Sequence, residues 1–252
     1  MGIGTTTPEG ALDVVSTDSG VILPRVANAA AVTTPVNGML IYDLSTKCVR
    51  VYQNSDWSLC FGDPVPSVGS PTGKIWMDRN LGATQVATSS TDADSYGDLY
   101  QWGRNTHGHQ LRTSSVTVGP VSSGSEGSDF IRNGTTPYNW LSTQDDTRWG
   151  ATKTANDPCP SGYRVPTEAE LESERTLFSS NDANGAYASV LKLPAAGNRN
   201  ASTAAFNNVD INGYYWSSTV NGSNARNLAF YISTANMYDN ARSFGFSVRC
   251  IR

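Results

Sequence analysis

The chain has 252 residues, which is room for one large domain or two smaller ones that each bury a core without a metal or cofactor. Its 18 Lys and Arg stand against 22 Asp and Glu, and a net charge of -4 argues against binding to nucleic acid. No apolar run approaches the roughly 20 residues that cross a bilayer, and 23 Gly with 12 Pro favour short strands and ordered loops over a helical protein.

Residues 1–62 are predicted to form a small β-rich unit. Short apolar segments at residues 12–15, 20–24 and 38–43 are separated by turn-forming residues, a pattern that indicates strands. Residues 63–72 are rich in Pro, Gly and Ser and read as a linker, so a second domain is expected over residues 73–252.

The four cysteines predict two structural disulfides. Cys48 and Cys60 flank an alternating apolar and polar run with a turn at residues 54–56, and a hairpin there brings the two thiols side by side. Cys159 then pairs with Cys250. Four buried free thiols remain the alternative, because virion proteins assembled in a reducing cytosol can keep their cysteines reduced.

Short motifs in the first unit carry a resemblance to a known module. They are Gly2-Ile3-Gly4-Thr5-Thr6-Thr7-Pro8, Leu12-Asp13-Val14, Leu23-Pro24-Arg25 and Gly38-Met39-Leu40-Ile41-Tyr42. This set resembles a module common in phage tail fibres and Bacteroidetes surface proteins. The resemblance implies a fibre or trimerisation module and a homotrimer.

In the second unit, a long polar stretch precedes one clear helix. Residues 103–157 are turn-rich and predict long loops held by isolated aromatic anchors, which are Phe130, Tyr138, Trp140 and Trp149. After Pro166, Thr167 and Glu170 form a capping-box pattern that predicts a helix over residues 167–178. Leu171, Leu177 and Phe178 are expected to dock on a sheet. Glu168, Glu172 and Glu174 are expected to form a mainly solvated face.

Several motifs of the second unit occur in a characteristic order. They are Trp76-Met77-Asp78-Arg79-Asn80-Leu81-Gly82, Tyr96-Gly97-Asp98-Leu99-Tyr100-Gln101-Trp102-Gly103, Cys159-Pro160-Ser161-Gly162-Tyr163-Arg164-Val165-Pro166-Thr167-Glu168, Tyr215-Trp216-Ser217-Ser218-Thr219 and Gly245-Phe246-Ser247-Val248-Arg249-Cys250. Together they resemble the FISUMP (major paralogous domain) family. That family is related to the C-type-lectin-like fold of formylglycine-generating enzymes and of retroelement-diversified variable proteins. The resemblance implies an α+β, C-type-lectin-like domain after the fibre module.

Residues 221–244 are predicted to be a variable region. In the expected strand over residues 227–233, Leu228, Phe230 and Ile232 share one face, which packs, and the alternate residues share a face that is free to vary. In the diversified relatives, Asn codons mutate only to codons that exclude Lys, Glu, Gln, Met and Trp. No Lys, Glu, Gln or Trp occurs in residues 221–244. An Asn-rich loop held by its own hydrogen bonds explains the Asn content equally well, but it does not explain Tyr231, Tyr238 and Phe244.

Tyrosine mixed with small polar residues is the composition of antibody binding loops. The variable face is therefore expected to contact a ligand, on a scaffold fixed by Trp216, Met237 and Phe246. The predicted contact residues are Asn227, Ala229, Tyr231, Ser233, Thr234, Tyr238, Asp239, Asn240, Ala241, Ser243 and Phe244.

Metal and catalytic sites are not implied by this sequence. His107 and His109 could bind a metal ion where chains meet. Because no Cys or acidic residue lies near them in the sequence, we expect them to be ordinary loop residues instead. Asp92, Asp94 and Asp98 lack the calcium-loop pattern. Neither Cys159 nor Cys250 falls where the catalytic pair of formylglycine-generating enzymes belongs. We expect no cofactor, no metal and no enzyme activity.

The sequence thus predicts an extracellular binding protein, at a virion tail or a bacterial cell surface. Its expected partner is a protein or glycan receptor, recognised by a surface that a retroelement diversifies. A structural fibre or adhesin tip with a fixed lectin-like domain is the alternative.

Overall fold

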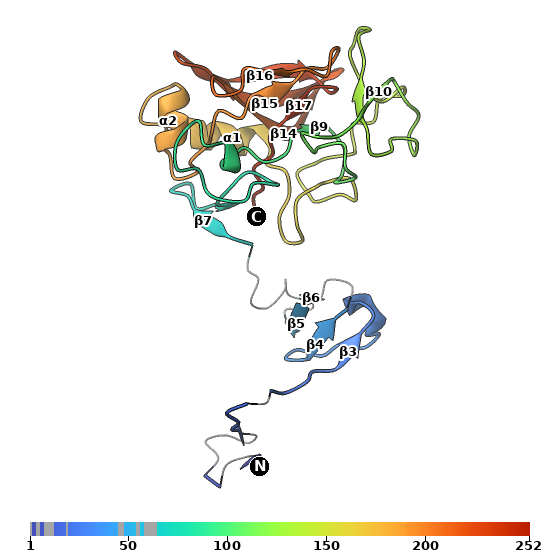
Figure 1. The fold of residues 1–252 in the computed structure, drawn as a ribbon, viewed down its shortest axis with the longest axis vertical. Coiled ribbons are helices and arrows are strands. Elements are labelled where there is room, and N and C mark those ends of the chain that lie inside the picture. The colour runs from blue at the N-terminus through green and yellow to red at the C-terminus, as the bar shows by residue number, and fades with distance from the viewer. Residues whose placement is uncertain are drawn as a thin grey trace. The chain divides into compact units, whose positions relative to one another are not determined.

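The computed structural model describes residues 2–3, 6–7, 13–18, 20–44, 48–53, 56–57 and 65–252. The chain forms two compact units, residues 1–64 and residues 65–252 (Figure 1). Short strands are the main regular elements of both units, and the two α-helices found in the described residues belong to the second unit. The protein is therefore β-rich with few helices, as its composition predicted.

The first unit is built around one small sheet. Its strands, in spatial order, are β3 (Arg25–Val26), β4 (Leu40–Asp43), β5 (Cys48–Gln53) and β6 (Asp56–Trp57). The first pair is parallel and the other two pairs are antiparallel. A separate parallel pair joins β1 (Gly2–Ile3) to β2 (Asp13–Val14), and a short 3-10 helix spans Ala29–Ala31.

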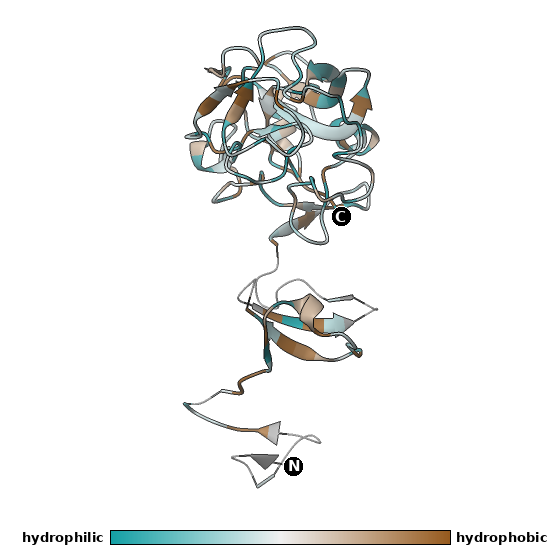
Figure 2. Cartoon of the chain, turned by 90° about the vertical axis from the view of Figure 1, so that its right-hand side faces the viewer, coloured by the Kyte–Doolittle hydropathy of each residue, from teal (hydrophilic) through white to brown (hydrophobic). Residues whose placement is uncertain are grey.

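The apolar run at residues 20–24 is not a strand, contrary to the prediction. The chain joins the sheet only at β3, which begins at Arg25. Just before it, the Pro24 carbonyl accepts a hydrogen bond from the Tyr42 backbone amide at 2.8 Å. Val21 and Ile22 are 66% and 76% exposed. Hydrophobic residues (brown in Figure 2) therefore lie on the surface of this unit as well as in its strands.

The predicted hairpin before the linker is present. Tyr52 on β5 lies opposite Trp57 on β6, and the centroids of the two rings are 5.2 Å apart in an edge-on arrangement. Cys60 lies outside the described residues, so the predicted bond between Cys48 and Cys60 does too.

A three-stranded antiparallel sheet organises the second unit (Figure 1). It consists of β14 (Gly213–Asn221), β15 (Asn224–Phe230) and β16 (Ala235–Ala241) in that order. A two-residue turn links the first two strands, and Gly222 there has a φ of +56°, which a side chain would strain. The turn from β15 to β16 spans residues 231–234 and is closed by a hydrogen bond from the Tyr231 amide to the Thr234 carbonyl.

Short strands complete the second unit. A four-stranded sheet has the order β13 (Phe206–Asn207), β12 (Asn198–Arg199), β17 (Gly245–Phe246) and β9 (Tyr100–Gln101). Two further pairs join β7 (Ser67–Gly69) to β8 (Ile75–Met77) and β10 (Val116–Val118) to β11 (Phe130–Arg132), and a 3-10 helix spans Ala93–Ser95.

The main core lies between one face of the three-stranded sheet and the helices. Tyr215, Leu228 and Phe230 project from that face and pack with residues of α1 (Glu168–Arg175) and α2 (Ala183–Ala188). The predicted capping box of α1 is present, because Thr167 and Glu170 exchange side-chain and backbone hydrogen bonds. The helix ends at Arg175, three residues before the predicted end.

Glu174 was predicted to be solvated, and this is wrong. Its carboxyl side chain is 3% exposed and accepts hydrogen bonds from Ser70 Oγ at 2.7 Å, Thr72 Oγ1 at 2.6 Å and Trp76 Nε1 at 3.0 Å. These donors belong to the segment that starts the second unit, about a hundred residues earlier. The carboxylate therefore fastens that segment to α1, a long-range contact that the helical periodicity does not reveal.

Three of the four predicted aromatic anchors hold the long loops. Phe130, Trp140 and Trp149 are buried, whereas Tyr138 is 39% exposed. The indole N–H of Trp140 donates to the Trp102 carbonyl at 2.8 Å. Hydrogen bonds of this kind satisfy carbonyls that the irregular backbone cannot pair with itself.

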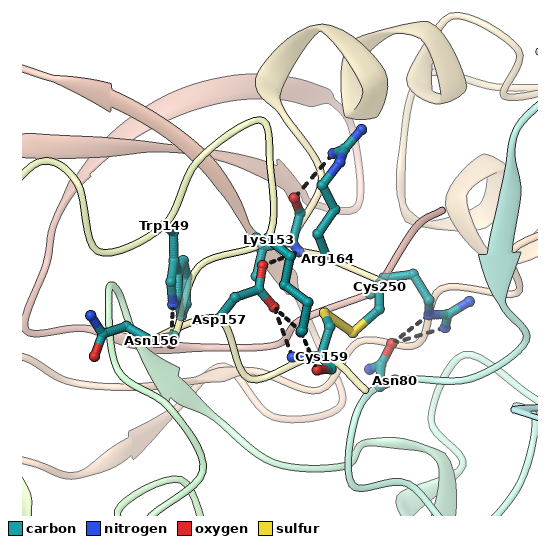
Figure 3. Close-up of a disulfide and its surroundings, with 10 residues drawn as sticks. Asn80, Trp149, Lys153, Asn156, Asp157, Cys159, Arg164 and Cys250 are labelled. Carbon is teal, nitrogen blue, oxygen red and sulfur yellow. Dashed lines mark hydrogen bonds and ion pairs between the residues drawn. A yellow bond between two sulfur atoms is a disulfide. The ribbon is translucent and has the colours of Figure 1, made fainter. Parts of the chain in front are cut away.

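Cys159 and Cys250 form a disulfide, as predicted (Figure 3). Beside it, the Asp157 carboxylate accepts the backbone N–H groups of Cys159 and Val165, each at 2.9 Å, and pairs with Lys153 at 3.3 Å. The bond joins the segment before α1 to the carboxyl-terminal end of the chain.

Removing this disulfide is expected to destabilise the second unit. The bond closes 91 residues, so the chain-entropy account assigns it about 4 to 5 kcal/mol. In a Cys48→Ser/Cys60→Ser background, Cys159→Ala/Cys250→Ala should lower the free energy of unfolding of the second unit by that amount. In urea unfolding, this loss appears as a lower midpoint. The background protein alone is the control, and an unchanged midpoint contradicts the prediction.

Acid is expected to weaken the start of α1. Burial opposes ionisation of Glu170, but hydrogen bonds from Arg164 and Thr167 outweigh it and hold the pKa of this carboxyl at about 2, against 4.5 ordinarily. Because the folded-state pKa is depressed, the stabilisation is full above pH 4.5 and is lost as the pH falls toward 2.

The stability difference between wild type and Glu170→Gln should therefore shrink over this window when urea unfolding is measured at each pH. The stability difference between wild type and Arg164→Met should shrink over the same pH window, because this variant also removes hydrogen bonds that favour the ionised carboxyl of Glu170. A difference that does not vary with pH contradicts the assignment.

Candidate functional site

A groove of about 330 Å³ opens beside the three-stranded sheet, where β16 and the turn before it meet the four-stranded sheet. Two separate stretches of the chain contribute its lining. They supply Asn198, Asn200, Asn207, Asn208, Tyr214, Tyr231, Tyr238, Asp239, Asn240, Phe244 and Phe246.

Aromatic rings form a continuous cluster along the groove. Tyr231 lies edge-on to both Tyr238 and Tyr214, with centroid distances of 5.9 Å and 6.1 Å. Phe246 stacks on Tyr214 at 5.1 Å and on Phe244 at 5.5 Å. Each ring is thus fixed by its neighbours, and aromatic faces and edges are presented in a defined arrangement.

The Tyr231 hydroxyl remains neutral over the physiological pH range. Burial, together with the neighbouring Tyr214 and Tyr238, raises the pKa of Tyr231 to about 12, so this phenol can donate a hydrogen bond. The Tyr214 hydroxyl accepts hydrogen bonds from the side-chain amides of Asn208 at 3.1 Å and Asn212 at 3.3 Å.

Side-chain amides, here called the amide wall, form another part of the lining. Asn198 is 5% exposed, and its buried Oδ1 has no hydrogen-bond partner among the residues that the structure describes. Asn207 is exposed and its amide makes no side-chain hydrogen bond within the same described part of the chain. Asn240 uses its amide N–H to reach Asn227 Oδ1 at 2.8 Å. Several amide donors and acceptors are thus available to a ligand.

The single carboxylate of the lining is paired within the protein. Asp239 pairs with Arg226 at 3.1 Å and accepts a hydrogen bond from Asn221 at 3.1 Å. Arg226 also binds Glu168 of α1, at 2.7 Å, so one cation is shared by two carboxylates. The groove accordingly presents aromatic faces, amides and one paired carboxylate.

The structure brings five of the predicted contact residues together in this groove: Tyr231, Tyr238, Asp239, Asn240 and Phe244. Ser233 and Thr234 lie in the turn after β15 and do not line the groove; Ser233 is exposed and Thr234 is half-buried.

Four predicted contact residues are buried and cannot contact a ligand, which corrects the prediction. Two of them, Asn227 and Ala229, lie on the strand face that was predicted to be free. Asn227, Ala229 and Ser243 are 0% exposed and Ala241 is 9% exposed. Trp216, whose ring packs on Phe246 at 4.3 Å, lies opposite Asn227 on the neighbouring strand. Both faces of the sheet are therefore covered, one by helices and the other by aromatic side chains. Ile232, predicted to pack, lies in the turn and is 82% exposed.

Sequence reasoning missed the amide wall. Asn198, Asn200, Asn207 and Asn208 precede the predicted variable region, and Tyr214 begins the strand before it. The clustering of four Asn within eleven positions was the available signal, but nothing local indicates which residues they face.

His109 is fully buried, and its Nε2 accepts a hydrogen bond from the Gln101 amide at 3.3 Å. Burial holds the pKa of this imidazole well below its usual range, so it stays neutral. Among the residues that the structure describes, no three His, Cys, Asp or Glu side chains lie close enough to hold a metal ion.

Residues 2–72 match the family model described as a phage tail like trimerisation region. No curated protein and no solved structure matches the chain. Within the part of the chain described, no helix is both long and apolar enough to span a membrane. The amino-terminal region is thus similar to a phage tail-like trimerisation region, which supports a homotrimer and a location on a virion tail or a surface.

Proposed function

We propose that this protein is the receptor-binding end of a phage tail fibre, and that it binds rather than catalyses. In this proposal the first unit joins three chains, and the second unit is an α+β, C-type-lectin-like domain that presents the groove to a receptor. The resemblance to diversified variable proteins adds that residues 221–244 differ between variants of the protein.

One observation carries the proposal. Tyr231, Tyr238 and Phe244, which the sequence singled out as unexplained by an Asn-rich loop, lie together along one groove. Their rings are only partly buried, so they have area left to contact a partner. Burial of Asn227, Ala229, Ala241 and Ser243 restricts the proposed variable contacts to the rim of the sheet.

Removing both groove tyrosines is expected to abolish receptor binding. The labelled full chain should bind a subset of strains in a panel of bacteria, and Tyr231→Ala/Tyr238→Ala should weaken that binding more than about 30-fold, as loss of central interface aromatics does. Melting should fall by only a few degrees, because both rings are only partly buried in the folded chain.

Tyr187→Ala is the matched control, since Tyr187 is also half-buried but lies on α2 outside the groove. Equal binding by the double variant and this control contradicts the proposed site, and binding to no strain contradicts receptor binding.

The exposed apolar residues of the first unit are the proposed contacts between chains. Val21, Ile22 and Leu44 line an apolar hollow of about 340 Å³ in that unit, and all three are at least half exposed in the single chain. Exposed apolar clusters of this kind mark protein interfaces. They lie within the residues that match the trimerisation region.

Ile22→Asp is expected to dissociate the trimer. Burying an isoleucine is worth about 1.5–3 kcal/mol for each chain, and a carboxylate in its place adds a desolvation cost. Light scattering after size exclusion should show a lower mass at micromolar concentration. Val118→Asp, at a position 65% exposed in the second unit, is the control. An unchanged mass for Ile22→Asp contradicts this interface.

A further inference from the structure

We infer that the groove binds an uncharged saccharide, without a metal ion. This inference rests on the proposed function and specifies the chemical class of the receptor. The proposed site is the lining that the amides of Asn198 and Asn207 form together with the rings of Tyr231 and Tyr238.

The charge of the lining favours a neutral ligand. Among the described residues that line the groove, none is Arg, Lys or His, so a sialic acid, phosphate or sulfate group has no cation to meet. The single carboxylate, on Asp239, is already paired with Arg226 at 3.1 Å. A cationic ligand would therefore compete with an existing ion pair.

The polar groups match hydroxyls. A side-chain amide offers a donor and an acceptor next to each other, and adjacent hydroxyls of a sugar ring offer the same pair. Asn207 is exposed, and its amide makes no side-chain hydrogen bond within the described part of the chain. Its donor and its acceptor are both open to the hydroxyls of a ligand.

The apolar lining is entirely aromatic. No Leu, Ile, Val or Met belongs to the described lining, so the groove lacks the aliphatic pocket that usually receives an anchor side chain of a protein partner. Aromatic rings can instead pack against the C–H face of a pyranose. A volume of about 330 Å³ is at the small end for ligand sites, and it suits about one or two sugar rings.

No metal is needed for this recognition. The described residues hold no cluster of three His, Cys, Asp or Glu side chains, and the amides and phenols bind hydroxyls directly. The affinity is accordingly expected to be independent of EDTA, and nearly independent of salt between about 0.05 and about 0.5 M because a neutral ligand is not screened.

The test uses the full chain and a bacterial strain that it binds. Cells are treated either with periodate, which cleaves vicinal diols, or with proteinase K, and binding is measured in excess EDTA. Polysaccharide extracted from the same strain is then titrated by calorimetry. We expect binding to survive the protease, to be lost after periodate, and to be reproduced by the extracted polysaccharide.

Asn207→Ala tests the amide wall, because this exposed residue can be changed without disturbing the core. Loss of its hydrogen bonds should weaken polysaccharide binding about fivefold or more. Asn184→Ala, an exposed amide on α2 outside the groove, should have no effect. Equal affinities for these two variants contradict the role of the amide wall.

The outcomes separate the two proposals. Binding that resists periodate but not protease, and that is still lost in Tyr231→Ala/Tyr238→Ala, overturns the saccharide and leaves receptor binding intact. Polysaccharide binding that falls steeply with salt identifies a charged glycan and also overturns the inference. Binding of cells and polysaccharide that is unaffected by the double variant overturns the proposed function itself.

Discussion

The second unit depends on buried side chains that donate hydrogen bonds to backbone carbonyls of both strands and loops. Trp102 Nε1 donates to the Ser217 carbonyl at 2.9 Å, and Trp216 Nε1 donates to the Tyr100 carbonyl at 2.8 Å. Arg104 is 1% exposed and donates mainly to carbonyls of the loop that precedes β11. A buried carbonyl left unpaired costs about 1–3 kcal/mol, so long loops can be packed inside only where such donors exist.

A further buried donor of this kind holds the backbone beside the groove in place. Gln101 on β9 donates to the Ser243 carbonyl at 2.9 Å and to the Ile131 carbonyl at 2.7 Å. Ser243 immediately precedes Phe244, whose ring stacks on Phe246 in the groove. Because the backbone on both sides of these rings is fixed, a ligand does not have to order them when it binds. That saves part of the entropy that association otherwise loses.

Most features that depend on neighbouring residues could be predicted from the sequence, whereas most long-range contacts, apart from the Cys159–Cys250 disulfide, could not. The capping box of Thr167 and Glu170 spans four positions and is present. The burial of Glu174 depends on donors about a hundred residues away, and the burial of Asn227 and Ala229 depends on aromatic side chains from other segments. Alternation along the strand correctly separated Leu228 from Asn227, but it carries no information on whether the second face is covered.

The two walls of the groove come from different parts of the chain, and this division bears on how recognition can change. Tyr231 and Tyr238 belong to the region proposed to vary, whereas Asn198 and Asn207 lie outside it. Substitutions in the first wall would alter which surface of a ligand is contacted, while the amide wall would continue to select for hydroxyls. Specificity could therefore shift among members of one ligand class without loss of binding. Such a shift costs little stability, because Tyr231 and Tyr238 are only partly buried in the folded chain.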